Sequence, residues 1–191
     1  STYPTLSIFR GLTHTNIYHN SVHNTSSGAA MEFDRYQSSG NNIVNNIFKA
    51  NTGYGMHFQN STLTANTIAE SDYNNLFTSG SFIARDGSTN YGTLSSWQTA
   101  TGFEANSTSI DPQFPSGTDL HTSVSALSAA GKNVNAEVPD DIDGVARPSM
   151  PSLGATQFGA SGTPLSGEYT INASGSGPTN CWPSSGCPTS P

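Results

Sequence analysis

The chain has 191 residues, only 10% of them charged, and a formal net charge of −7. Six Lys and Arg residues are too few to cluster against phosphates, so we expect no nucleic-acid partner. No apolar run approaches the roughly 20 residues of a membrane-spanning helix, and we expect no membrane span. The remaining composition, rich in Ser, Thr, Asn and Gly, favours strands and turns over helices.

Short apolar runs alternate with Asn-rich turns in the first part of the chain. Residues 16–24 align without gaps with residues 42–50, and each copy is followed by a Gly turn and a second apolar run. A looser copy covers residues 63–68, and residues 72–77 repeat the Asn-Asn-apolar-apolar signature of residues 45–48. A repeat of about two dozen residues is typical of solenoids, in which stacked units together bury a core that no single unit could bury.

Helical periodicity is weak along the whole chain. The best candidate is residues 93–101, which Thr93 or Ser95 would cap, and a second short candidate is residues 123–130. We expect the large side chain of Trp97 to plug an end of the solenoid rather than to bind a ligand.

A resemblance to a known family follows from these repeats and from the segment behind them. The Asn- and Ile-rich repeats resemble the coils of the right-handed parallel β-helix, the pectin-lyase-like solenoid. The next stretch resembles the closing segment of that family's large secreted surface proteins from Gram-negative bacteria. The resemblance covers roughly residues 12–158, and the motifs that carry it beyond the repeats lie at residues 72–77, 93–98, 109–114, 118–121, 141–148 and 153–158.

The resemblance implies an all-β chain with two parts. Residues 1–158 would form a right-handed parallel β-helix with an irregular C-terminal capping segment. Residues 159–191 are dominated by Gly, Ser, Thr and Pro, and we expect a linker or a surface-lying tail. Five residues separate Cys181 from Cys187, which permits a small disulfide loop. An exported protein favours this bridge over two free thiols.

Asparagines recur at one place in the repeats. In stacked coils, Asn20, Asn46 and Asn75 would form a structural ladder by bonding to the backbone of neighbouring coils, and Asn also tolerates the left-handed backbone of coil corners. The alternative is a polar row that binds sugar or ice. His14, His19 and His23 are spaced like metal ligands on a helix, but this spacing does not make them converge in a coil. We expect these histidines to be exposed.

An acidic motif precedes Gly144. We expect Asp143, or in its place Asp141, to form a structural ion pair with Arg147, because the motif carries its own cation. The alternative is a Ca²⁺ site at Asp141 and Asp143, for which a full calcium loop would need more oxygen ligands. We expect no other cofactor.

A catalytic role would need residues that the sequence supplies sparsely. A polysaccharide lyase needs a base and a cation, and a glycoside hydrolase needs two facing carboxylates. The catalytic candidates are Asp34 and Arg35, with Asp72 or Asp86 as the second carboxylate.

We therefore predict a non-catalytic, extracellular module of a secreted bacterial cell-surface protein, with a structural or adhesive role. Its expected partners are neighbouring modules of a longer chain or copies of itself that stack into fibres, with polysaccharide as a candidate ligand. The alternative function is a polysaccharide lyase or glycoside hydrolase of the pectin-lyase-like class. A third reading is an ice- or sugar-binding module that uses a flat polar face.

Overall fold

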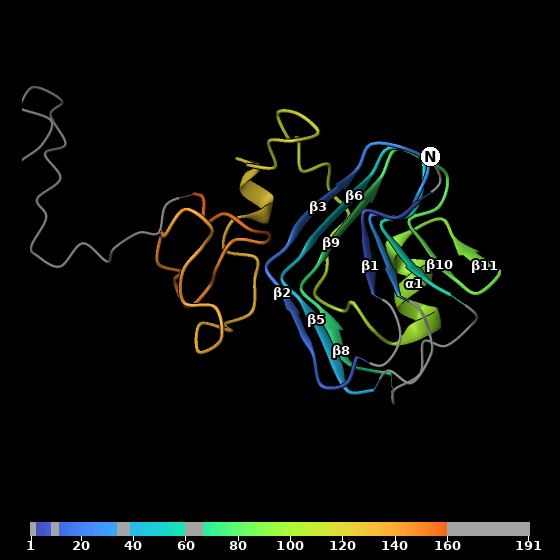
Figure 1. Ribbon diagram of the computed structural model, residues 1–191, viewed down its shortest axis with the longest axis horizontal. Helices are drawn as coiled ribbons and strands as arrows, with labels where there is room; N and C mark the ends of the chain where they lie inside the picture. Colours follow the sequence, from blue (N-terminus) through green and yellow to red (C-terminus); the bar gives the residue numbers. More distant parts are fainter. Residues whose placement is uncertain (1–2, 9–11, 34–38, 60–66, 160–191) are drawn as a thin grey trace, which may run out of the picture. The chain divides into compact units, whose positions relative to one another are not determined.

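The computed structural model describes residues 3–8, 12–33, 39–59 and 67–159, and these are built mainly from short strands in three sheets (Figure 1). The chain divides into two compact units, Ser1–Gly159 and Ala160–Pro191. The second unit, which contains the predicted tail, lies outside the described residues. Within the described ranges, no helix has the length and apolar character that crossing a membrane requires.

The strands are short, and nearly all of them pair in parallel. The first sheet has the order β1 (Leu6–Ile8), β4 (Met31–Phe33), β7 (Met56–Phe58), β10 (Ala84–Asp86) and β11 (Thr89–Tyr91). The second sheet holds β2 (Asn16–Tyr18), β5 (Asn41–Val44) and β8 (Ile68–Asp72). The third sheet holds β3 (Ser21–Asn24), β6 (Ile47–Ala50) and β9 (Asn75–Thr78). Only β10 and β11 pair antiparallel among these strands.

From β1 to β10 successive strands belong to different sheets, so the chain visits the three sheets in turn and returns to the first. We call one such passage a coil. The gapless sequence alignment predicted the register between the first two coils, in which Asn16 faces Asn42 and Val22 faces Phe48. The strand-rich, largely parallel architecture confirms the predicted β class, and it is compatible with a parallel β-helix.

Alternation along each strand directs apolar side chains into the interior, where they stack on their equivalents in the next coil. Met31 lies opposite Met56, and both are fully buried. The rings of Phe33 and Phe58 stack in the same way, with centroids 5.6 Å apart. Burial of these large side chains in every coil supplies the main stabilisation of the stack.

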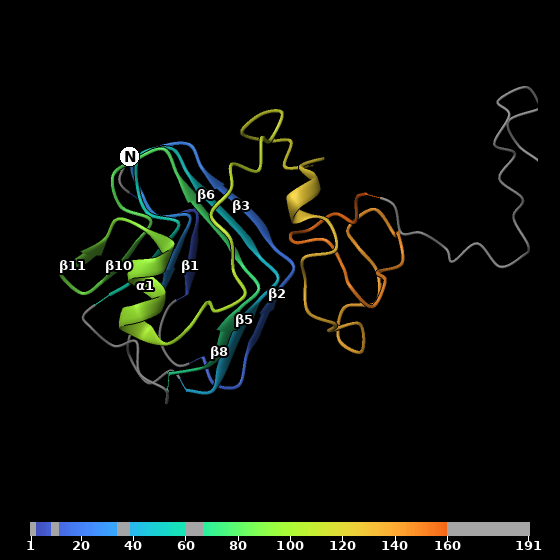
Figure 2. The same ribbon diagram turned by 180° about the vertical axis from the view of Figure 1, so that it is seen from behind.

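Helix α1 (Leu94–Thr101) closes the interior after the last coil (Figure 2). It begins at a capping box between Thr93 and Ser96 and ends at Gly102, whose φ of 75° is left-handed, so the predicted helix is confirmed. Trp97 is only 1% exposed, and its ring lies 6.0 Å from that of Phe58. The indole therefore packs into the core at this end, as the sequence predicted.

Residues 103–159, which we call the closing segment, contain little regular structure beyond a 3₁₀ turn, η1 (Ser125–Leu127). Ile47 points out of its coil and is buried against Leu127 and Leu153 of this segment. Gly154 has a left-handed φ of 85°, and a Cβ there would lie 2.5 Å from Ser21 Oγ and 2.8 Å from Ile47 Cδ1, so the position favours glycine. The part of the segment after η1 lies beside β2 and β3 in both views, away from α1 (Figures 1 and 2). The sequence predicted that this part of the chain caps the end of the solenoid. In the structure the closing segment also packs against the outer side of the coils.

Replacing Trp97 with Ala should lower the free energy of unfolding by about 3–5 kcal/mol, because it leaves a cavity at the end of the stacked interior. Chemical denaturation followed by circular dichroism measures this change. Phe82→Ala is the control, since Phe82 is 40% exposed and should lose less than about 1 kcal/mol. Equal losses in the two variants would contradict the plugging role of Trp97.

Candidate functional site

Three ionisable side chains line up on the outer face of the first sheet. Strand pairing places Glu32 of β4 beside His57 of β7, and His57 beside Arg85 of β10. Glu32 and His57 each lie between two buried residues of their own strand, so alternation turns them outward. We call this set the Glu32–His57–Arg85 row.

Hydrogen bonds hold the acidic end of the row. His57 Nδ1 lies 2.9 Å from Glu32 Oε2, and Gln59 Nε2 donates to Glu32 Oε1 over 2.8 Å. Both oxygens of the Glu32 carboxylate are therefore engaged. The side chains of Glu32 and His57 are only 16% and 15% exposed, so this contact is largely shielded from solvent.

The basic end of the row lies beside an aromatic ring. The Arg85 guanidinium carbon is 5.8 Å from the centroid of the Tyr54 ring. The Tyr54 hydroxyl donates to Asn90 Oδ1 over 3.1 Å, and Asn90 itself is exposed on β11. A guanidinium, an aromatic face and a planar amide are groups that recognise sugar rings and their acidic substituents.

Burial sets the protonation state of His57. Desolvation lowers the pKa of His57 below its ordinary value, the Glu32 carboxylate opposes this shift, and Arg85 adds to it. The imidazole is therefore neutral at pH 7, with Nδ1–H donated to Glu32 and a lone pair on Nε2. This arrangement gives the row one proton acceptor, Nε2, next to one fixed cation, Arg85.

Of the predicted hydrolase carboxylates, the described residues include Asp72 and Asp86. Asp34 and Arg35 lie outside the described residues. Asp72 lies on β8 of the second sheet, where its carboxylate accepts bonds from Asn106 N–H at 2.7 Å and Asn106 Nδ2 at 2.8 Å. Asp86 lies on β10 of the first sheet.

A second polar row runs inside the coils. Asn20 Nδ2 donates to Asn46 Oδ1 over 2.9 Å, and Asn46 Nδ2 donates to Asn74 Oδ1 over 3.0 Å. Asn46 is fully buried and also donates to the carbonyls of Ile17 and Val44, so each hydrogen of its side-chain amide has an acceptor in the interior. Asn20 and Asn46 thus belong to a ladder, as predicted from their spacing.

The third rung is Asn74, not Asn75 as predicted from the sequence. The prediction aligned Asn75 with Asn46 by matching residues 72–77 to residues 45–48. Strand pairing sets Asn75 opposite Ile47 instead, one residue later. Asn75 faces the closing segment instead. Its side chain accepts from Ile110 N–H over 2.9 Å and donates to Ile110 O over 2.9 Å.

Glu104, a residue that sequence reasoning missed, ends the ladder. Its buried carboxylate accepts from Asn74 Nδ2 at 3.0 Å and from the hydroxyls of Ser71 and Ser107. Burial raises the pKa of Glu104, and the hydrogen bonds from Ser107, Ser71 and Asn74 oppose the rise. An isolated Glu in a polar stretch carries no periodic signal, so nothing in the sequence pointed to it.

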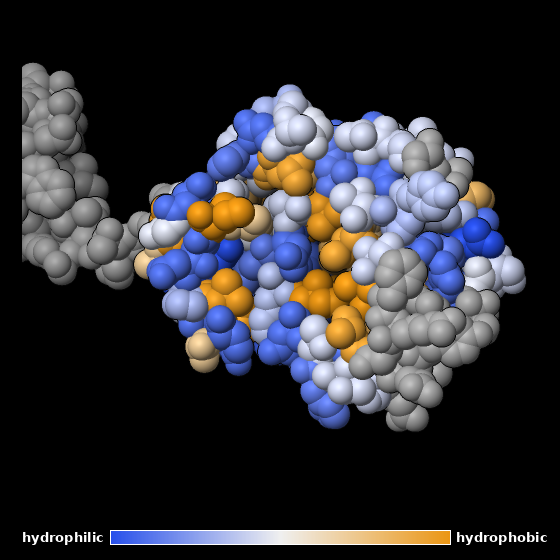
Figure 3. Space-filling view, in the orientation of Figure 1, coloured by the Kyte–Doolittle hydropathy of each residue, from blue (hydrophilic) through white to orange (hydrophobic). Residues whose placement is uncertain are grey.

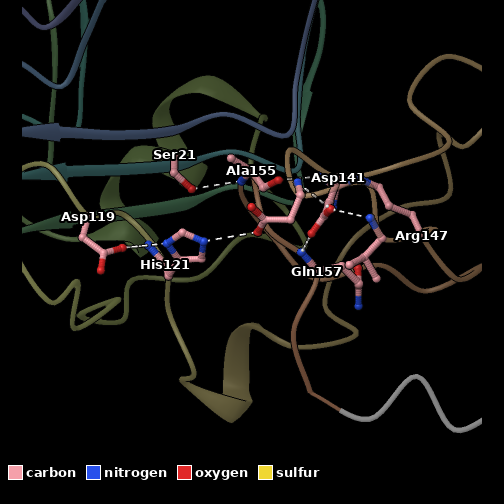
Figure 4. A network of polar contacts seen from close by, with 9 residues as sticks. Ser21, Asp119, His121, Asp141, Arg147, Ala155 and Gln157 are labelled. Carbon is pink, nitrogen blue, oxygen red and sulfur yellow. Dashed lines mark hydrogen bonds and ion pairs between the residues drawn. The ribbon is translucent and has the colours of Figure 1, made fainter.

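The predicted ion pair between Asp143 and Arg147 is absent from the described contacts (Figure 4). Asp143 lies against His121, with Oδ2 3.2 Å from Nε2, while His121 Nδ1 lies 2.6 Å from Asp119 Oδ1. Arg147 is buried and donates to the carbonyls of Gly154 and Ala155 at 3.2 and 3.0 Å. The arginine therefore fixes backbone rather than a carboxylate.

Asp141 is committed to backbone groups. Oδ1 accepts from the N–H groups of Asp143 and Val145 at 2.9 and 2.7 Å, and Oδ2 accepts from Gln157 N–H at 2.6 Å (Figure 4). These bonds lower the pKa of Asp141 despite its burial. Asp143 turns away toward His121, so the two carboxylates do not converge as calcium ligands would. In the described part of the chain, no group of three or more His, Cys, Asp or Glu residues is placed to hold a metal ion.

The remaining predicted residues are the three histidines and the two cysteines. His14 is exposed, but the predicted exposure of His19 is wrong, because this side chain is only 5% exposed. His23 is partly buried and bonds Asn51 Oδ1 at 2.9 Å. Cys181 and Cys187 lie outside the described residues, so their bridge stays a prediction.

Replacing Asn46 with Ala should lower the free energy of unfolding by about 3 kcal/mol, because the buried bonds of its side-chain amide to Asn20, Asn74 and the backbone are lost. Urea denaturation measures the loss. Asn16→Ala is the matched control, since Asn16 is exposed and bonds Asn42 at the surface, and it should lose less than about 1 kcal/mol. A loss for Asn46→Ala no greater than for the control would contradict an internal ladder.

The pKa of His57, measured by NMR titration, should lie below 6.5, and Glu32→Gln should lower it further. The sign follows from the carboxylate, which favours the protonated imidazole and is lost in the variant. The pKa of His121, which Asp119 and Asp143 raise, should stay unchanged in this variant and serves as the control. A rise in the pKa of His57 after Glu32→Gln would show that the pair does not interact as described.

Comparisons with known proteins do not place the chain in a family. No family model, no curated protein and no solved structure matches it. Its function must therefore be inferred from its own residues and their geometry.

Proposed function

We propose that this chain is a non-catalytic module of a secreted right-handed parallel β-helix protein of the pectin-lyase-like class, and that it contacts glycans at a bacterial cell surface. The structural role rests on one observation: two lysine–carboxylate ion pairs connect the coils to the closing segment. Lys49 Nζ lies 2.6 Å from Asp111, and Lys132 Nζ lies 2.6 Å from Glu70, so both lysines join the coils to the closing segment. Glu32 and His57 join two coils.

The state of Glu32 supports a non-catalytic role. A general acid or nucleophile needs a carboxyl oxygen that can reach the substrate. Both Glu32 oxygens accept hydrogen bonds from neighbouring side chains, and the carboxylate is largely shielded. The charge of Glu32 is thus used to orient His57.

Glycan contact is proposed at the Arg85 end of the Glu32–His57–Arg85 row. Arg85, the Tyr54 ring and the exposed amide of Asn90 offer a cation, an aromatic surface and hydrogen-bonding groups side by side. The face drawn in Figure 3 is largely polar, with several apolar patches. A sugar chain lying along β10 and β11 would use the ring for stacking and Arg85 for an acidic substituent.

Neighbouring modules or copies of the chain are proposed to stack on the first coil. Ile8, Ile17 and Val22 keep 7–8% exposure, whereas the equivalent residues of the second coil, Ile43 and Phe48, have none. Among the described residues, β1, β2 and β3 each pair on one side only. The opposite end is covered by α1, so stacking would use the first-coil end.

One observation favours the enzymatic alternative of a polysaccharide lyase. A neutral His57 presents Nε2 as a proton acceptor beside Arg85, and a lyase needs a base next to a cation that neutralises a uronate carboxylate. This second candidate replaces the predicted pair of Asp34 and Arg35 with residues that the structure brings together.

Incubation of the chain with a panel of plant and algal polysaccharides separates the two functions. We expect binding to an acidic glycan without bond cleavage, and Arg85→Ala should raise the dissociation constant at least about tenfold. Lys132→Ala is the charge-matched control on another face and should bind like the unmodified chain. New reducing or unsaturated ends that disappear in His57→Ala would overturn the non-catalytic proposal in favour of the lyase.

A further inference from the structure

A buried histidine joins the coils to the closing segment. His19 lies in the turn between β2 and β3 with a φ of 53°, and it is 5% exposed. Its Nδ1 is 3.2 Å from the carbonyl oxygen of Gly154 in the closing segment. Its Nε2 is 2.9 Å from Asn45 Nδ2, in the equivalent turn of the next coil. One imidazole thus touches two coils and the segment that covers them.

The contacts of Asn45 determine which nitrogen of His19 carries the proton. Asn45 Nδ2 donates to Lys132 O over 2.7 Å, and Asn45 Oδ1 accepts from Lys132 N–H over 2.8 Å. Rotating the amide by half a turn would break both bonds, so the amide presents its NH₂ group to His19. His19 Nε2 must therefore accept, and Nδ1–H donates to Gly154. The site is built for a neutral ring.

A second proton on His19 has no acceptor in this site. It would sit on Nε2 and point at the donor Nδ2 of Asn45. Arg147 already donates to the same Gly154 carbonyl at 3.2 Å, so a second positive charge would lie beside a buried guanidinium. Burial, followed by the charge of Arg147, lowers the pKa of His19 to about 4.

The other charged groups near this site do not relieve the conflict. The ammonium of Lys132 is held by Glu70 at 2.6 and 2.8 Å. Asp141 gives Arg147 partial electrostatic compensation, but its oxygens are used by backbone N–H groups. Among the described contacts of the His19 ring, none is made by a carboxylate.

We propose that His19 is a pH-controlled latch, which holds the closing segment on the coils while its ring is neutral and releases that segment when the ring is protonated. Other hydrogen bonds between the closing segment and the coils lie next to the His19 contact with Gly154. Gly154 N–H donates to Asn45 O over 2.8 Å, and Ala155 N–H donates to Ser21 Oγ over 3.0 Å (Figure 4). Release would expose Ile47, which Leu127 and Leu153 cover in the closed state.

The direction of the pH effect follows from linkage. The ring binds a proton more weakly in the closed state than in the open state, so closure is favoured at neutral pH and weakens as the pH falls from 6.5 to about 4. One proton linked over this interval lowers the closed-to-open ratio about 100-fold. The proposed latch therefore opens when the pH falls, not when it rises.

Hydrogen exchange of the full chain at pH 7 and pH 4, corrected for intrinsic rates, tests the latch. The amides of Lys132 and Gly154, which bond to Asn45, report on the closing segment. The amide of Ala30, which donates to Tyr54 O over 2.7 Å, reports on the coils. We expect the protection of the first two to fall about 100-fold at pH 4 while that of Ala30 is retained.

His19→Gln should abolish the fall, because the amide can accept from Asn45 and donate to Gly154 without titrating. His121→Gln is the control and should release the segment like the unmodified chain, since His121 is exposed. An equal fall in His19→Gln, or a parallel loss at Ala30, would overturn the proposal.

NMR titration of His19 in the unmodified chain keeps the test independent of the folding of the variant. A titration midpoint that coincides with the loss of Lys132 and Gly154 protection supports the latch. A ring that titrates near pH 6.5 while the closing segment stays protected would refute it.

Discussion

Satisfaction of buried backbone groups at the coil corners is the constraint on which this structure depends. A sharp turn inside a stack places polar backbone groups away from water, and a group left without a partner there would cost free energy. Asn46 meets this need because its amide donates to Ile17 O and Val44 O and also bonds its counterparts in the coils before and after. The apolar side chains can stack in register only because these corners are held.

The same chemistry attaches the closing segment. Asn45, next to Asn46 and at a φ of 62°, turns its amide outward and takes both backbone groups of Lys132. One asparagine therefore fixes the interior and its neighbour fixes the cover. Ile47, the next residue, adds apolar contact with Leu127 and Leu153. Three consecutive residues thus connect the coil interior, the covering segment and the packing between them.

The sequence predicted what repeats and missed what is made by a single long-range contact. The alignment of residues 16–24 with residues 42–50 predicted strand register, because stacking imposes the same alternation on each coil. Asn74 was missed because matching the residue types of two coils assumed a register that differs by one residue from the observed strand pairing. The partner of Asp143 was missed because it comes from the distant His121, and no local spacing encodes that approach. His19 was misjudged because its burial comes from the closing segment, which the repeat pattern does not contain.

The direction of the asparagine row has a consequence for how such a chain can vary. Each side-chain amide donates toward the C-terminal end, and the row ends at Glu104, whose carboxyl oxygens accept from Asn74. The amide dipoles therefore run in one sense and finish at a side chain that has no amide group. A whole turn inserted before Glu104 would preserve this order, whereas one added after it would follow a side chain without an amide donor. Growth and shortening during evolution should therefore occur upstream of a fixed terminator.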